Sequence, residues 1–302
     1  MTSPRLSSRS NEGEPNRLVD GRLSRRNANE SLGGSTIVRR VGESRAVATI
    51  ADLTPYEVTL VFHLSRMRIA TRRQLGELQP QGGTSLAETR RLQRTLVGLV
   101  ERRVLARLER GSGGRRGGSQ GPLYTLDVVA QRLIAPDSRR RLRRPSFVGE
   151  RFTAHVLAVG DTYVRLARAA RVREIELIEF QSEPGCWTSY GDRYGQRQTL
   201  KPDAFVRVAA SEWEYVAFVE VDLATESLTT IVQKAKVYAE AYRAGDEQQR
   251  LGLFPIVLWL TSSQRRQRAL VETLARLPAE EWRLHRIARL EDVVDVLVGA
   301  SP

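Results

Sequence analysis

Residues 201–242 read KPDAFVRVAASEWEYVAFVEVDLATESLTTIVQKAKVYAEAY, and this stretch decides the fold. Apolar runs over 199–208 and 214–221 predict two strands joined by a tight turn. Residues 227–244 predict a helix, because apolar side chains recur there at helical spacing. The stretch therefore predicts a strand–turn–strand unit followed by a helix.

The flanking segments extend this unit on both sides. The further elements expected are a helix from Phe147 to about Ala170, strands over 173–180 and 255–260, a helix over 263–277, a strand over 282–287 and a terminal helix from Leu290. The order α-β-β-β-α-β-α-β predicts an α/β (α+β) domain over 147–302, in which helices flank a mixed sheet.

The lysines are confined to the same stretch. The chain has 48 basic residues, and its three lysines are Lys201, Lys234 and Lys236; all the others are arginines. A compact ammonium is not interchangeable with a planar guanidinium beside a scissile phosphate and a metal ion. Lysine kept only beside clustered carboxylates therefore favours a metal-dependent phosphodiester site.

Three carboxylates are candidates for that site. Asp203 follows a proline inside an apolar strand, where it either ends a turn or binds a ligand. Glu220 and Asp222 are two residues apart and share one face of their strand, so they repel each other unless a cation joins them. Their hard oxygens suit Mg²⁺ or Mn²⁺, and a magnesium ion would keep waters that can supply the nucleophile.

Residues 51–130 predict a winged-helix DNA-binding domain. Capping boxes begin three helices at Thr54, Thr71 and Ser85, and the runs 104–109 and 123–126 predict a hairpin after them. In a winged helix the third helix would enter the major groove and the hairpin, or wing, would touch the DNA backbone.

Arginines mark both parts that would meet DNA. Arg90, Arg91 and Arg94 point away from the apolar face of the third helix, and Arg115 and Arg116 stand at the hairpin tip. The alternative interpretation is a small helical domain whose arginines form only a solvated face. Together, the helix and the tip favour DNA.

Charge is distributed unevenly along the chain. The net charge is +13, and residues 151–302 carry 20 basic and 21 acidic side chains, so the excess lies in residues 1–150. This asymmetry favours a nucleic-acid-binding half joined to a half with another task. Residues 1–50 predict a disordered basic tail, and residues 131–146 predict a basic linker.

Composition also bounds the compartment. No apolar run is long enough to cross a bilayer, and no secretory signal is visible. The single cysteine, Cys186, suits a reducing cytoplasm, and the three scattered histidines argue against a structural zinc site. We expect a cytoplasmic protein without a membrane partner.

One loop mixes aromatic and basic residues. Cys186-Trp-Thr-Ser-Tyr190 is followed by Arg193, Tyr194 and Arg197. These side chains could stack on unpaired bases or line a cleft. The alternative is an ordinary packed loop.

The element order, with Pro202-Asp203 on the second strand and Glu220 late on the third, resembles the PD-(D/E)XK nuclease superfamily. The resemblance implies that Asp203 and Glu220 bind a divalent metal and that a lysine stands two residues after the glutamate. That position is Asp222 in this chain. In divergent members the next helix can supply the lysine, so the resemblance points to Lys234 or Lys236.

The wider pattern is similar to the replication-relaxation family, over roughly residues 50–295. It consists of the winged helix, Lys-Pro-Asp203, Glu220-Val-Asp-Leu-Ala-Thr-Glu226-Ser, and Lys234 with Tyr238 four residues on. The resemblance implies a protein of plasmids and other mobile elements that is linked to replication and DNA relaxation.

Two functions from different classes stay open. The first is a metal-dependent DNA endonuclease or nickase, in which Asp203, Glu220 and Asp222 hold Mg²⁺ or Mn²⁺ and Lys234 polarises the phosphate. The second is a catalytically inactive replication accessory or transcriptional regulator, motivated by the missing lysine. Both take double-stranded DNA, such as a plasmid or mobile-element origin, as partner. A homodimer and a relaxase or replication protein as further partner are compatible with both.

Overall fold

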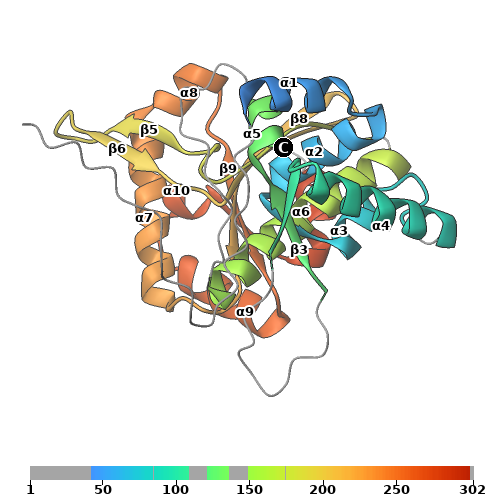
Figure 1. Cartoon of the computed structure of the whole chain (residues 1–302). Helices are drawn as coiled ribbons and strands as arrows, with labels where there is room; N and C mark the ends of the chain where they lie inside the picture. The colour runs from blue at the N-terminus through green and yellow to red at the C-terminus, as the bar shows by residue number, and fades with distance from the viewer. Residues whose placement is uncertain (1–41, 84, 109–120, 136–148, 174, 300–302) are drawn as a thin grey trace, which may run out of the picture. The chain divides into compact units, whose positions relative to one another are not determined.

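A computed structural model of the chain describes residues 42–83, 85–108, 121–135, 149–173 and 175–299, and these belong to one compact unit. Figure 1 shows how helices and strands alternate within it. The architecture is mixed α/β, as the sequence predicts. No helix of the described ranges is both long enough and apolar enough to cross a bilayer.

The N-terminal region has the architecture of a winged helix. Its helices are α2 (Pro55–Met67), α3 (Arg72–Glu77) and α4 (Leu86–Glu101). They adjoin an antiparallel sheet of order β1-β3-β2, with β1 (Ile69–Thr71), β2 (Leu105–Leu108) and β3 (Leu123–Leu126). The three predicted helices and the hairpin are confirmed. The hairpin tip with Arg115 and Arg116 lies outside the described residues.

Two of the three predicted capping boxes are formed. The Thr54 hydroxyl accepts a hydrogen bond from the Glu57 N–H, and the Glu57 side chain accepts one from the Thr54 N–H. Thr71 and Gln74 form the same reciprocal pair. At the third helix, Ser85 accepts from the N–H two residues on, at 3.2 Å. Glu88 bonds the backbone of the turn 81–83. Glu88 therefore fixes the turn before α4.

Two short helices fall where the sequence predicts a tail and a linker. α1 (Glu43–Ala51) and α5 (Val128–Ile134) pack against each other, and Ala46 of α1 is fully buried. The expected boundaries at 50 and 131 therefore lie inside helices. Helices of this length are not stable alone, so only their tertiary contact reveals them.

A five-stranded mixed sheet of order β10-β9-β8-β7-β4 forms the second region. Its strands are β4 (Ile175–Ser182), β7 (Ala204–Ala210), β8 (Trp213–Asp222), β9 (Ile256–Thr261) and β10 (His285–Arg289). β4, β7 and β8 are antiparallel, whereas β8, β9 and β10 are parallel. The carboxyl ends of the three parallel strands therefore meet at one edge of the sheet.

Helices cover both faces of this sheet (Figure 1). They are α6 (Glu150–Val172), α7 (Leu228–Ala244), α8 (Asp246–Leu251), α9 (Gln264–Leu274), α10 (Ala279–Trp282), the 3₁₀ turn η1 (Leu290–Asp292) and α11 (Val293–Val298). Val206 and Val219 face α6 and share one core with the winged helix. Phe205 and Phe218 face α7 and α9 and belong to a second core. Successive residues of a strand thus point to opposite faces of the sheet.

The predicted strand 199–208 is interrupted. β6 (Arg197–Leu200) pairs with β5 (Thr188–Gly191), and β7 begins only at Ala204. Pro202 cannot donate a ladder hydrogen bond, so the chain bends there. The strand expected over 282–287 is displaced as well, because Trp282 ends α10 and β10 begins at His285.

Candidate active site

Asp203 is held beside Glu220 by the ladder between β7 and β8. The Asp203 N–H donates to the Val219 carbonyl at 3.0 Å, and the Asp203 Oδ2 accepts from the Val221 N–H at 2.7 Å. These two bonds bracket Glu220 on β8. The register thus fixes two carboxylates next to each other, and both are at least 92% buried, with Asp203 8% and Glu220 3% exposed.

α7 adds a lysine and a tyrosine to this pair. Lys234 Nζ lies 3.2 Å from Glu220 Oε2 and 3.2 Å from Glu226 Oε2. The Tyr238 hydroxyl donates to Glu220 Oε1 at 2.6 Å. Lys234 and Tyr238 are one helical turn apart and share a face of α7. The structure therefore brings Asp203, Glu220 and Lys234 together, and of the two candidate lysines Lys234 faces the site.

Burial and charge set the protonation of the group. Burial and the neighbouring Asp203 carboxylate raise the pKa of Glu220 to about 8, against the opposing effect of Lys234. Burial lowers the pKa of the Lys234 ammonium, but Glu220, Asp203 and Glu226 outweigh it, so this pKa ends above its ordinary value. Lys234 therefore stays charged, and Glu220 keeps its proton to a higher pH than an exposed glutamate does.

His155 is a member of the site that sequence reasoning missed. It comes from α6, and its Nε2 lies 3.0 Å from Asp203 Oδ1. The hydrogen bond to Asp203 raises the pKa of His155, although burial opposes the rise. The one available signal was a polar residue inside the apolar pattern of α6, because the packing of α6 on the sheet is not visible in the sequence.

Asp222 lies on the same strand face but has different partners. Its Oδ2 accepts from Arg266 Nε at 2.5 Å, and its Oδ1 accepts from the Ala224 N–H at 2.8 Å. Arg266 also donates to the Glu226 carbonyl at 2.7 Å. Asp222 and Arg266 thus join the end of β8 to α9, and the structure does not bring Asp222 to Lys234. The sequence carries no signal for Arg266.

The donor set can be compared with what a metal ion needs. Among the described residues there is no group of three or more His, Cys, Asp and Glu side chains that could hold a metal. Mg²⁺ commonly takes one or two carboxylates and completes its shell with water and substrate phosphate. Asp203 and Glu220 fit that mode of binding, with a phosphodiester as the missing part.

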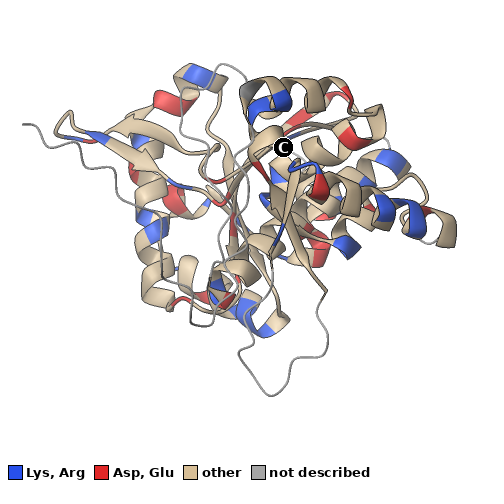
Figure 2. Ribbon diagram, viewed as in Figure 1, with Lys and Arg blue, Asp and Glu red and all other residues tan. Residues whose placement is uncertain are grey.

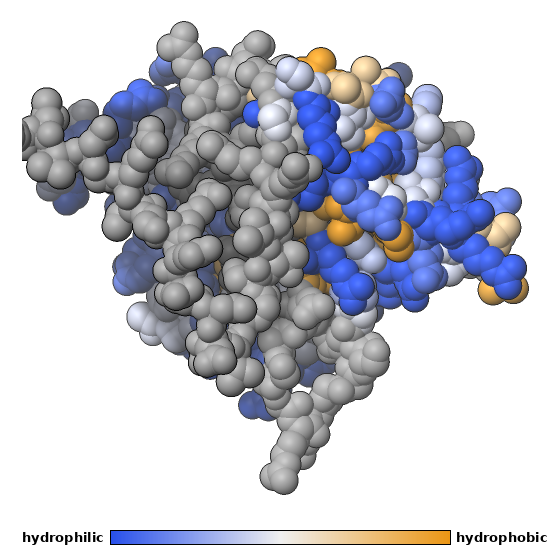
Figure 3. Space-filling view, viewed as in Figure 1, coloured by the Kyte–Doolittle hydropathy of each residue, from blue (hydrophilic) through white to orange (hydrophobic). Residues whose placement is uncertain are grey.

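The arginines of α4 divide into two sets. Arg90, Arg91 and Arg94 are all exposed, and Arg90 and Arg94 line a hollow with Gln93 and Val97. The Arg91 guanidinium instead lies 4.1 Å from the centre of the Tyr56 ring. Figure 2 shows the basic residues of this helix, and Figure 3 shows that the described surface on this side is largely hydrophilic.

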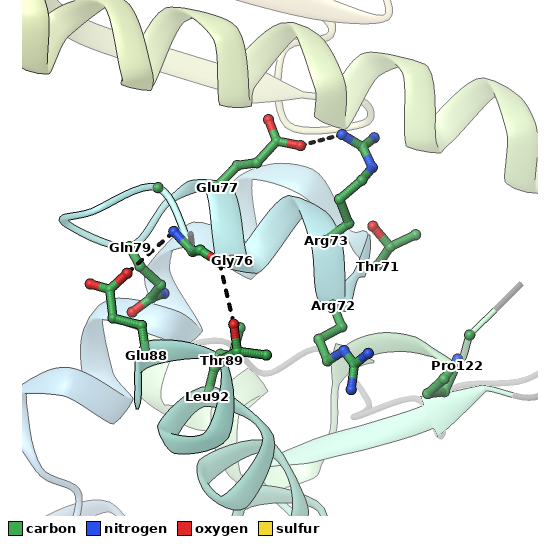
Figure 4. A pocket seen from close by; sticks show the side chains of 13 residues that line it. Thr71, Arg72, Arg73, Gly76, Glu77, Gln79, Glu88, Thr89, Leu92 and Pro122 are labelled. Atoms are coloured by element: carbon green, nitrogen blue, oxygen red, sulfur yellow. Dashed lines mark hydrogen bonds and ion pairs between the residues drawn. The ribbon is translucent and has the colours of Figure 1, made fainter. Parts of the chain in front are cut away.

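A second hollow lies between α3 and α4 (Figure 4), and none of Asp203, Glu220 and Lys234 lines it. Several of its charged groups already have protein partners. Arg73 bonds Glu77 and also Asp161, at 3.0 Å, and Glu88 accepts from the Gly83 N–H. We assign it no ligand.

Glu220 makes the stability of the protein depend on pH in a testable way. Because its folded pKa is raised, the folded state holds a proton that the unfolded state has lost between about pH 4.5 and pH 8. Its contribution to the unfolding free energy therefore falls by about 1.4 kcal/mol per pH unit as pH rises through that window. Glu220→Gln removes this slope, so the variant should gain stability relative to wild type between about pH 5.5 and pH 7.5.

Urea denaturation at the two pH values, without divalent metal, measures this gain. Glu226→Gln is the matched control, because Glu226 pairs with the same lysine from a more exposed position. A difference between Glu220→Gln and wild type that does not change with pH would contradict the raised pKa.

Comparison with known proteins adds one match. A family model described as replication-relaxation matches residues 62–257, a range that contains α4, Asp203, Glu220 and Lys234. No curated protein and no solved structure matches the chain.

Proposed function

The chain belongs to the replication-relaxation family, and from that premise we propose that it binds plasmid or mobile-element DNA and nicks it with a divalent metal. Asp203 and Glu220 would hold the metal, and Lys234 would contact the scissile phosphate. The winged helix would bind double-stranded DNA through the exposed Arg90 and Arg94 of α4.

The buried Asp203–Glu220–Lys234 group is the observation that carries this proposal. Two neighbouring carboxylates with 8% and 3% exposure are costly unless a cation compensates them. Apolar side chains at these positions would pack without that cost. Ionisable groups with strongly shifted pKa values gather at functional sites, and Glu220 and Lys234 both meet that description.

Mg²⁺ or Mn²⁺ bound to these carboxylates would supply a Lewis acid for the phosphate and lower the pKa of a water. The protein's own groups have separate tasks. Lys234 places a fixed positive charge where negative charge develops on the phosphate oxygens. Tyr238 and the Val221 N–H orient the Glu220 and Asp203 carboxylates, respectively. His155 holds the second Asp203 oxygen from the α6 side.

Lys234→Ala should slow nicking by roughly a hundredfold or more, because it removes the single charged donor proposed for the phosphate. Lys236→Ala is the matched control. Lys236 lies two residues on in α7 and is exposed, so its removal takes away the same charge outside the site. Initial rates of open-circle formation from supercoiled plasmid measure both. Equal rates in the two variants would remove Lys234 from the mechanism.

A second candidate function is DNA binding without cleavage, as a replication accessory or transcriptional regulator. It is favoured by the engagement of all four site oxygens with protein partners. Asp203 bonds His155 and the Val221 N–H, while Glu220 bonds Lys234 and Tyr238. Under this alternative the group is a structural network. Divalent metal should then neither change the stability of the protein nor lead to cleavage of the DNA.

A further inference from the structure

The hairpin β5–β6 presents one anchored face and one free face. Tyr190 and Leu200 are buried, and Thr188 donates to Glu247 of α8 at 2.6 Å, so these residues hold the hairpin to the body of the protein. Side chains alternate across a hairpin, and paired residues share a face. The opposite face therefore carries Ser189, Thr199 and Arg197.

The free face combines aromatic and basic groups. Trp187 is 41% exposed, and Lys201 Nζ lies 5.1 Å from the centre of its ring. Small hydroxyl side chains, Ser189 and Thr199, follow on this face. Arg197 then donates to Ser189 Oγ at 2.6 Å. An indole, two cations and small residues between them make a positively charged strip.

The turn of the hairpin adds charge of the same sign. Tyr194 is 73% exposed, and the Arg193 guanidinium lies 4.8 Å from the centre of its ring. The one acid of the hairpin, Asp192, accepts from the N–H groups of Tyr194 and Gln196, both at 2.9 Å. The Asp192 carboxylate thus stabilises the backbone of the turn. Figure 1 shows the hairpin beside α7, and Figure 2 shows basic residues along it.

The strip ends at the candidate active site. Lys201 stands two residues before Asp203, and the Cys186 thiol bonds the Pro202 carbonyl between them at 3.1 Å. This bond ties the base of the hairpin to the segment that carries Asp203. A chain lying on the strip would therefore lead to the carboxylates.

We propose that the free face of the β5–β6 hairpin binds an unpaired DNA strand and leads it to Asp203. Exposed rings flanked by cations stack on bases and hold phosphates, and only an unpaired base offers its face for stacking. Duplex DNA is the partner proposed for the winged helix, so the winged helix and the hairpin would bind different parts of the same substrate. The inference rests on the proposed function, because it names the part of the substrate that enters that site.

The test measures the affinity of the protein for a fluorescent oligothymidylate of about twelve nucleotides, by anisotropy in EDTA. The affinity for a duplex of equal length is measured in the same way. Trp187→Ala should weaken oligothymidylate binding roughly tenfold or more and leave duplex binding within about twofold. Trp213→Ala is the matched control, since Trp213 is 57% exposed and begins β8 at the opposite end from Glu220. It should change neither affinity.

A second variant keeps the test valid if Trp187→Ala does not fold. Arg197→Ala removes one exposed cation from the same strip and should weaken oligothymidylate binding several-fold, with a shallower salt dependence. A loss of affinity that is equal for Trp187→Ala and Trp213→Ala, or no oligothymidylate binding by wild type, would overturn the inference. The binding assay contains no metal and does not depend on cleavage. A protein that binds oligothymidylate but does not nick DNA would therefore count against the proposed function and not against the strip.

Discussion

Asp203→Asn protein is expected to bind DNA as wild type does and to nick it at least about a thousandfold more slowly. The substitution keeps the side-chain volume and an oxygen for the Val221 N–H, but it removes half of the charge that would hold the metal. A thousandfold loss corresponds to about 4 kcal/mol of transition-state stabilisation, which is within what a metal ion supplies to phosphate chemistry. Single-turnover nicking and gel shifts of the same samples measure the two properties.

Asp222→Asn is the matched control for that loss. It removes the same charge from a buried carboxylate on the strand that carries Glu220, but this carboxylate bonds Arg266. Nicking by Asp222→Asn should stay within about tenfold of wild type once circular dichroism shows that the protein is folded. If Asp222→Asn loses as much activity as Asp203→Asn, Asp222 belongs to the metal site.

DNA affinity is expected to fall by roughly 10³–10⁵ between about 50 and 200 mM salt, provided that six to ten phosphates are contacted. Each phosphate that an arginine neutralises releases counterions, and the net charge of +13 supports contacts of that number. Anisotropy titrations of a duplex at four or five salt concentrations give the slope. A flat response would remove DNA as a partner.

The α4 arginines should account for a defined share of this slope. The double variant Arg90→Ala, Arg94→Ala should lower the log–log slope by about two, roughly one for each phosphate that an arginine no longer neutralises. Arg286→Ala is the control, because Arg286 is exposed on β10, the sheet edge opposite β4. A larger change from Arg286→Ala than from the pair would place the DNA elsewhere.

The sequence predicts those parts of the fold that local patterns specify. The winged-helix elements are confirmed, and so is the α-β-β-β-α-β-α-β order for the five-stranded sheet and its main helices, because apolar periodicity and caps are contained within each segment. The strand β5 and the helix α8 are not part of the predicted order. Residues 201–242 contain Asp203, Glu220 and Lys234. The pairing of β7 with β8 places the two carboxylates side by side, and α7, the helix after β8, adds Lys234. These contacts join residues that lie close together in the sequence.

The missing parts depend on long-range packing. His155 is 48 residues before Asp203, and Arg266 is 44 residues after Asp222, so neither contact follows from spacing. α1 becomes a helix against α5 in the same way. The break at Pro202 was readable in principle, because a proline without an N–H argues against a continuous strand.

Conversion of supercoiled plasmid to open circles by purified wild-type protein tests the central claim most directly. Reactions with Mg²⁺, with Mn²⁺ and with EDTA are compared at one protein concentration, and Asp203→Asn protein purified in the same way controls for contaminating nuclease. We predict open circles with either metal, none with EDTA and none with the variant. Equal conversion by wild type and Asp203→Asn, or no conversion of DNA that the protein demonstrably binds, including its own origin, would contradict the account.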